Sequence, residues 1–133
     1  MNIKQVKILD CTLRDGGYYN NWNFKNDLVK TYVDAVNNLP IDIVEVGFRF
    51  LTKKNFQGNF AFIKDNYIKK LNFNKNVKIA IMINASDLLK NDKKNQKKVL
   101  LKLLNFKKNS TVSHVRIAVH FREVNKIVPY LAK

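Results

Sequence analysis

Arg14 and Asp15 stand side by side near the N-terminus, and both side-chain types could do chemistry. The Asp15 carboxylate is a hard oxygen ligand that suits Mg²⁺, Mn²⁺ or another divalent cation. Arg14 is permanently charged, and its planar donor fork could hold a substrate carboxylate or stabilise an enolate oxygen. Gly16 and Gly17 would let the backbone turn and approach a ligand closely. The alternative is that Arg14 and Asp15 form a surface ion pair at a glycine turn.

The elements that must position this pair alternate between strands and helices. Short β-branched runs predict strands over 6–11, 41–48, 77–83 and 112–119. Helical periodicity predicts helices over 26–39, 60–71, 94–106 and 123–132, with a helical turn over 86–89. We expect loops over 12–25 and 49–59. The order βαβαβαβα indicates a parallel sheet with right-handed crossovers.

Arg14 and Asp15 then follow the first strand, at the end where parallel α/β folds gather functional groups. Four β/α units are half of an eight-unit barrel, which typically takes roughly 250 residues. The sequence therefore predicts one domain over 1–133. That domain is either a small open α/β sheet or the N-terminal half of a (β/α)₈ TIM barrel.

Three segments carry a resemblance to a known family. The run LDCTLRDGG (9–17) resembles the opening signature of the pyruvate carboxyltransferase-like, metal-dependent aldolase and lyase superfamily, whose fold is a (β/α)₈ barrel. VEVGFR (44–49) resembles the end of that family's second strand, and VRIAVH (115–120) resembles the fourth-strand Arg-x-Ala-x-His run of its aldolases. The longer stretch 10–22 most resembles an aldolase-like branch. The resemblance covers this whole chain but about half of the family's barrel.

The resemblance implies roles for single residues. Asp15 matches the family's metal-binding aspartate, with Mg²⁺ or Mn²⁺ as the expected cofactor. Arg14 matches the arginine that stabilises a pyruvate-type enolate. The substrate would be a small keto acid or acyl compound in which a carbon–carbon bond is made or broken. The family completes its metal site with a His-x-His motif near strand seven, and His114 and His120 do not form such a pair.

Tyr18 stands where the 4-hydroxy-2-oxovalerate aldolases of this family have a histidine that serves as general base. A phenol with a pKa of about 10 is a poor base, so the candidate catalytic role of Tyr18 is to donate a hydrogen bond. Another residue or water would then take the proton. Together with Tyr19, Trp22 and Phe24, Tyr18 forms either a lid over the site or the apolar cover of a long loop.

Three further residues are candidates for substrate binding. Glu45 lies inside an apolar strand, where it either orients Arg14 or a metal-bound water, or pairs with a lysine or arginine inside the barrel. Arg49 ends the second strand and either reaches an anionic substrate group or is a solvated loop arginine. His120 ends the fourth strand, where it is either an active-site group or a satisfied rim histidine.

Composition limits the function classes. The net charge is +15, but 21 of the 25 cations are Lys and are spread along the chain, which is typical of solvated faces. Nucleic-acid binding is therefore a minor alternative, although the charge permits non-specific attraction. No apolar run is long enough to span a membrane, and no signal segment is evident, so we expect a cytoplasmic protein. The single cysteine, Cys11, is expected to pack in the core.

The leading hypothesis is the N-terminal half of a metal-dependent aldolase or lyase barrel. Alone, this chain would be weakly active or inactive unless a second chain or a C-terminal half completes the barrel. One alternative from another class is a non-catalytic half-barrel that binds a second copy or another protein. The other is the basic nucleic-acid-binding domain.

Overall fold

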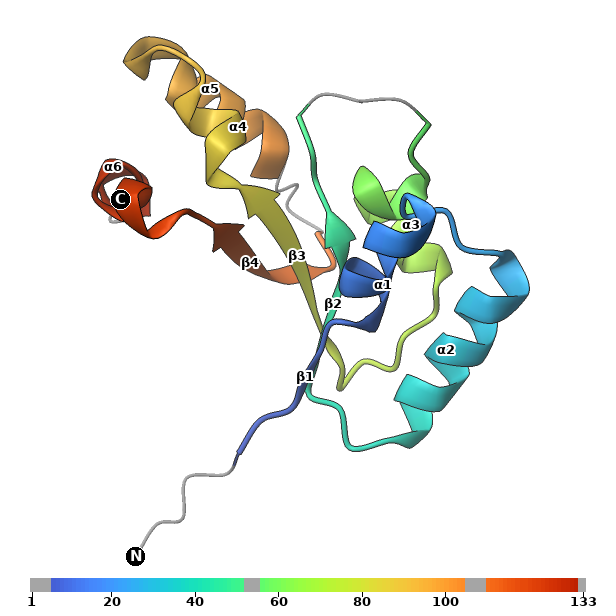
Figure 1. Cartoon of the computed structure of the whole chain (residues 1–133). Helices are drawn as coiled ribbons and strands as arrows, with labels where there is room; N and C mark the ends of the chain where they lie inside the picture. The colour runs from blue at the N-terminus through green and yellow to red at the C-terminus, as the bar shows by residue number, and fades with distance from the viewer. Residues whose placement is uncertain (1–5, 52–55, 105–109, 132–133) are drawn as a thin grey trace, which may run out of the picture.

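A four-stranded parallel sheet organises the protein in the computed structural model, which describes residues 6–51, 56–104 and 110–131. The strands lie in the order β1-β2-β3-β4 (Figure 1). Their bounds are β1 Leu9–Asp10, β2 Ile43–Phe48, β3 Lys78–Asn84 and β4 Val112–Ala118. All three strand pairings are parallel, which confirms the expected parallel sheet. β1 is much shorter than the strand expected over 6–11.

The helices are also close to expectation, with one exception. They are α1 Thr12–Asn20, α2 Asn26–Asn38, α3 Asp65–Lys70, α4 Ala85–Leu89, α5 Lys93–Leu104 and α6 Val124–Leu131. Two short 3₁₀ helices, η1 Asn59–Ala61 and η2 Phe121–Glu123, complete the list. The helix expected over 60–71 is therefore divided between η1 and α3. The expected helix ends at 105–106 and 132 lie outside the described residues.

The exception is α1, because the stretch from Thr12 was expected to be a loop and is a helix. Gly16 and Gly17 lower helix propensity, which is why the stretch resembles a loop in sequence. The helix begins where the Asp10 carboxylate accepts hydrogen bonds from the Thr12 amide and hydroxyl, at 3.0 and 2.9 Å. Neither glycine has a positive φ, so the expectation of a glycine turn is wrong.

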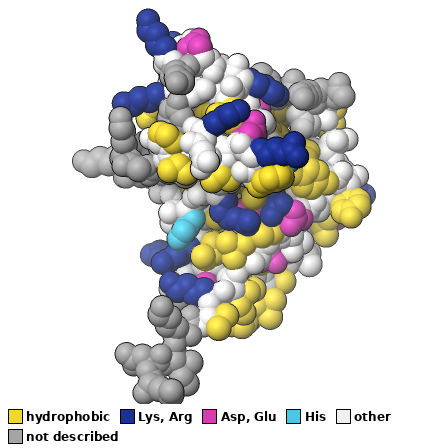
Figure 2. Space-filling view, turned by 60° about the vertical axis from the view of Figure 1, so that its left-hand side comes forward, with side chains coloured by type: hydrophobic (Ala, Val, Ile, Leu, Met, Phe, Trp, Pro, Cys, Tyr) yellow, Lys and Arg dark blue, Asp and Glu magenta, His cyan; other side chains and the backbone are white. Residues whose placement is uncertain are grey.

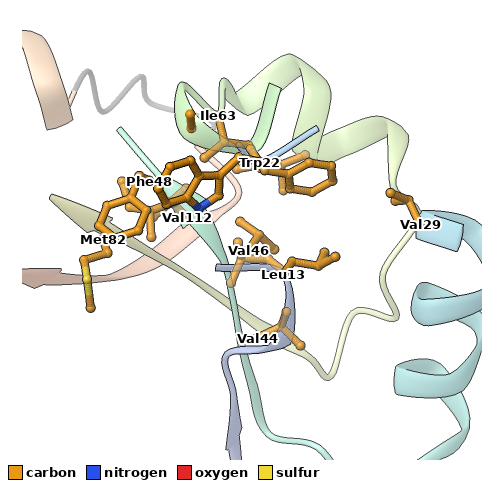
Figure 3. Packing of buried hydrophobic residues seen from close by; sticks show 14 of the residues in the cluster. Leu13, Trp22, Val29, Val44, Val46, Phe48, Ile63, Met82 and Val112 are labelled. Carbon is orange, nitrogen blue, oxygen red and sulfur yellow. The ribbon is translucent and has the colours of Figure 1, made fainter. Parts of the chain in front are cut away.

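Two hydrophobic clusters hold the helices against the sheet. In Figure 1, α1, α2 and α3 lie to the right of the strands, α4 and α5 lie above them, and α6 lies to the left. The larger cluster packs the first three helices against β2 and β3, and Figure 3 shows part of it around Phe48 and Val46. The smaller cluster joins Ile83 of β3 to α4, α5 and α6. Burial of these apolar faces is the main stabilising contribution to such a fold.

The buried face of α2 is a stripe of valines. Val29, Val33 and Val36 are buried, whereas Leu28 and Leu39 are more than half exposed. The three valines lie on one face of the helix, and that face packs against the core. The two leucines lie outside this face and are therefore exposed to solvent. Within the described residues, no helix is both long enough and apolar enough to cross a membrane.

Candidate active site

The centre of the candidate site is Glu45 of β2, whose side chain is 0% exposed. Arg14 Nε donates to Glu45 Oε1 at 2.6 Å. Arg116 Nη1 of β4 donates to the same oxygen at 3.3 Å and lies 3.2 Å from Oε2 as an ion pair. A buried carboxylate is costly unless it is paired, and here two guanidinium groups share it. We call Arg14, Glu45 and Arg116 the arginine–glutamate cluster.

Sheet register explains how residues so distant in sequence meet. Glu45 pairs with Ala80 of β3, and Ala80 pairs with His114 of β4. Arg116 lies two residues beyond His114, so it faces the same side of the sheet as Glu45. Ala80 carries only a methyl group, which leaves room for Arg116 to reach across β3. Arg14 approaches from the first turn of α1, directly after β1.

Both expected roles of Glu45 describe part of what the structure shows. The carboxylate contacts Arg14, and it also pairs with a second arginine in the sheet. Burial alone would lower the pKa of Arg14, but the hydrogen bond to Glu45 and its negative charge raise it. The Arg14 guanidinium therefore stays fully charged. Its position over the Phe48 ring, 6.0 Å from the ring centre, adds a cation–π contact.

Cys11 lies at the edge of this cluster. Its Sγ accepts a weak hydrogen bond from Arg116 Nη1 at 3.6 Å. Burial raises the pKa of the Cys11 thiol, and the negative charge of Glu45 raises it further, while Arg14 and Arg116 act in the opposite direction. The thiol therefore stays protonated and packs as an ordinary side chain.

Asp15, the expected metal ligand, lies beside the cluster on the solvent side. Its side chain is 58% exposed, and Oδ1 accepts a hydrogen bond from Arg14 Nη1. Asp15 could give one oxygen to a cation. No group of three or more His, Cys, Asp or Glu side chains suited to a metal is present in the part of the chain that the structure describes. These residues alone do not complete a metal site, and metal binding stays a prediction.

Tyr18 lies one helical turn after Arg14 and is 63% exposed. Its ring packs edge-on against Trp22 and Phe48, with centroid distances of 4.9 and 6.1 Å. Tyr18 is four positions after Arg14, so both lie on the same face of α1. Trp22 is buried, whereas Tyr18 and Tyr19 are exposed, which favours a buried apolar anchor with two exposed tyrosines over a four-residue lid.

Arg49 is buried away from solvent, so the expectation of a solvated loop arginine is wrong. Nη2 pairs with Asp65 at 2.7 Å, and Nε donates to the Ile63 carbonyl at 3.1 Å. Nη1 donates to the Leu103 carbonyl at 3.3 Å and to the carbonyl of Leu104. These contacts join the end of β2 to α3 and the end of α5. Substrate binding by Arg49 is untested, and we leave it out of the proposed site because its guanidinium serves these contacts.

His120 lies just after β4 and is exposed. It forms the N-cap of η2, where its Nδ1 accepts from the Arg122 amide at 3.4 Å, and its ring lies beside Phe121. These contacts match the alternative of a satisfied rim histidine, and a role in substrate binding stays a prediction. His114, at the other end of β4, is bonded to Ser113.

Sequence reasoning did not select Arg116 as a site residue, and it considered Trp22 only as part of a lid or of the apolar cover of a loop. Arg116 could have been found from strand periodicity, because it faces the same side of its strand as His120. The stretch that holds Trp22 was expected to be a loop, so the sequence did not indicate that its ring contacts Arg14. Its indole Nε1 donates to the Arg14 carbonyl at 2.9 Å, which places the ring beside the backbone of Arg14.

Comparison with known proteins gives one informative match. A solved structure described as the "N-terminal domain of a putative aldolase from Bacteroides vulgatus" is 37% identical, with a TM-score of 0.73. The match covers 93% of this chain and 39% of that chain. The fold is that of an aldolase-like half-barrel. No family model matches the chain, and no curated protein does.

The half-barrel fold removes one alternative left open by the sequence. Four parallel strands in sequential order, in a fold shared with an aldolase N-terminal domain, favour half of a barrel over a small open sheet. The chain spans 39% of the length of that similar protein. The arginine–glutamate cluster then lies in an aldolase-like half-barrel that matches part of that similar protein.

Proposed function

We propose that this chain is the N-terminal part of an aldolase or lyase that makes or breaks a carbon–carbon bond through a pyruvate-type enolate. The observation that carries the proposal is the Arg14 guanidinium, which the buried Glu45 holds at 2.6 Å beside the sheet of an aldolase-like fold. A fixed cation at this place suits negative charge that develops on a substrate oxygen.

Arg14 would act on the substrate and Glu45 would position Arg14. The contacts with Glu45 and Asp15 use Nε and Nη1 of Arg14, and Nη2 carries two further N–H groups. Those groups could hold the carboxylate and enolate oxygens of a small keto acid. Arg116 adds a second positive charge, so two cations share one buried carboxylate. The two guanidinium groups suit an anionic ligand, and the carboxylate of Asp15 beside Arg14 offsets part of their positive charge.

Asp15 and Tyr18 complete the proposed site. Asp15 would give one oxygen ligand to Mg²⁺ or Mn²⁺, which when bound supplies Lewis-acid chemistry at the substrate carbonyl. The remaining ligands would come from outside the described residues, in a second chain or a C-terminal half. Tyr18 is open to solvent on the face of Arg14, where its hydroxyl could donate a hydrogen bond to a substrate oxygen. We propose that the chain alone is weakly active or inactive, because Asp15 by itself does not complete the metal site.

Oxalate binding tests the proposal without requiring turnover. Oxalate is a planar dianion with the shape of a pyruvate enolate, and its binding to the purified chain can be followed by NMR titration. We expect Arg14→Gln to weaken binding about tenfold or more, because it removes charge-assisted hydrogen bonds. Arg122→Gln is the matched control, since Arg122 contacts Phe121 and the turn after β4. Equal loss in both variants, or none in Arg14→Gln, would refute the role of Arg14.

A second measurement addresses activity. Hydrogen–deuterium exchange at the methyl group of pyruvate reports enolisation, with and without Mg²⁺ or Mn²⁺. We expect little exchange from the chain alone. Rapid metal-dependent exchange by the purified chain, with no partner present, would show that the chain needs no second half. Light scattering after size-exclusion chromatography tests the alternative of a non-catalytic half-barrel. That alternative predicts a stable assembly of defined mass, whereas an isolated part of an enzyme should aggregate or be partly unfolded.

A further inference from the structure

Trp22 is held in an unusual position next to Arg14. It is 6% exposed and follows the end of α1, where Asn21 and Trp22 have φ values of 56° and 57°. Bulky side chains rarely adopt this left-handed conformation, so surrounding contacts must hold Trp22 there. Gly58 packs on the same backbone, and its amide donates to the Asn21 carbonyl at 2.9 Å.

The indole ring is seated on the side of α1 that carries Arg14. Its Nε1 donates to the Arg14 carbonyl at 2.9 Å. The ring also packs edge-on against Phe48, at a centroid distance of 5.5 Å (Figure 3). It packs in the same way against Phe50, at 5.2 Å. Gly17 makes this seat possible, because a Cβ there would lie 1.9 Å from Trp22 Cδ1. Gly16 is different, because a Cβ there would meet only Phe24, at 3.7 Å.

Helix α1 needs such support. It has nine residues, and two of them are glycines. Helices this short are marginal alone, and each glycine weakens them further. Gly17 therefore lowers the helix propensity of α1, but it allows the indole of Trp22 to pack against the helix. The contact fixes the helical turn from which Arg14 reaches Glu45.

We propose that Trp22, seated on Gly17, is a positioning residue that holds Arg14 in place for the substrate anion. The proposal rests on the proposed function, because it concerns the orientation of the same arginine. Trp22 acts through the Arg14 backbone and the first turns of α1, and it does not touch the substrate. Loss of the contact between the Trp22 indole and Gly17 would leave Arg14 present and charged, but its guanidinium could then move away from Glu45.

The test is the rate at which the Arg14 Nε–H exchanges its proton with water, measured by NMR on the full 133-residue chain. Only four arginines are present, so their Nε–H signals can be assigned individually. The bond to the buried Glu45 should protect the Arg14 Nε–H. Arg49 is an internal control, because its Nε–H is bonded to the Ile63 carbonyl within the core.

Gly17→Ala and Gly16→Ala form a matched pair. Alanine raises helix propensity equally at both positions, but only at position 17 does it displace the indole. We expect Gly17→Ala to speed exchange at Arg14 about tenfold or more, with Arg49 changed less than about twofold. Gly16→Ala should leave Arg14 as slow as in the original chain, or slower.

Trp22→Phe is the second variant, in case Gly17→Ala does not fold. It keeps an aromatic ring and deletes the N–H donor, so the same selective loss at Arg14 is expected. Unchanged protection of Arg14, or parallel acceleration at Arg14 and Arg49, would overturn the proposal. Proton exchange at Arg14 needs no ligand. Failure of oxalate to bind would therefore refute the proposed function, whereas the exchange rates would still test whether Trp22 positions Arg14.

Discussion

At the scale of single residues, one buried carboxylate organises the candidate site. Glu45 has no exposed surface and contacts guanidinium groups from α1 and β4. Neither arginine could be replaced by a neutral group without leaving a less well compensated charge inside the sheet. The same pairing keeps Arg14 in one orientation, which is what binding a substrate anion requires.

Glu45→Gln should lower the free energy of unfolding by about 3 kcal/mol, because it leaves two arginines without their buried counter-charge. Urea denaturation followed by circular dichroism measures the change. Asp34→Asn is the control, since it breaks only the exposed pair between Lys30 and Asp34 and should have little effect. A loss in Glu45→Gln no larger than in this control would show that the cluster contributes nothing to stability.

At the scale of elements, α1 and α2 are both fixed to the end of β1 through Asp10. Asp10 accepts from Thr12 at the start of α1 and from the Tyr32 hydroxyl of α2. Burial raises the pKa of Tyr32 well above its usual range, and the hydrogen bond to Asp10 raises it further. The phenol therefore remains neutral in the folded protein at pH values where it ionises in the unfolded chain.

This difference predicts a loss of stability at alkaline pH. Because the folded-state pKa is raised, the contribution of Tyr32 is complete below pH of about 10 and declines as the pH rises further. The slope is at most about 1.4 kcal/mol per pH unit. The measurement is the difference in free energy of unfolding between the original chain and Tyr32→Phe, from pH 8 to 11. Other titrating groups cancel in that difference, and a difference that grows with pH would contradict the assignment.

At the scale of the whole molecule, Arg49 connects parts of the chain that the sheet alone does not join. It links the end of β2 with Asp65 of α3 and with the last carbonyls of α5. Ser110, at the start of the segment that leads into β4, also donates to Asp65 at 3.2 Å. The positive charge lies at the C-terminal end of α5, where the helix dipole favours it.

Arg49→Met should cost about 3 kcal/mol of stability, because it leaves the mostly buried carboxylate of Asp65 without its cation. Adding Asp65→Leu should recover part of that loss, since no unpaired charge would remain. Thermal and urea unfolding of the single and double variants measure the effect, with the exposed Arg122→Met as the control. Additive losses in the double variant would mean that Arg49 and Asp65 do not act as a pair.

The net charge of +15 is a property of the whole molecule. Lys and Arg side chains are spread among hydrophobic side chains on the face shown in Figure 2 and form no continuous basic patch there. A distribution of this kind gives solubility and weak attraction to polyanions. It does not favour nucleic-acid binding over the site built around Arg14.

The sequence by itself determined the alternation of four strands with helices, except for α1, and it predicted that Arg14 and Asp15 follow the first strand. Hydrophobic periodicity depends on local spacing, so β2, β3, β4 and α2 were predictable within a few residues. The motif around Arg14 and Asp15 likewise named two adjacent residues without any knowledge of the fold. The predictions of strands and helices succeed because neighbours in sequence report on local geometry, and the catalytic roles of Arg14 and Asp15 stay predictions.

Only the tertiary structure decided what those residues contact. Glu45 and Arg116 are 71 positions apart, and strand register brings them together across β3. α1 could not be predicted from helix propensity, because the indole of Trp22 compensates for Gly17 through a contact that no local pattern encodes. Burial of Arg49 likewise depends on carbonyls at the end of α5, more than fifty positions away. Long-range packing overrides local preference because its contacts outweigh the propensity of a few residues.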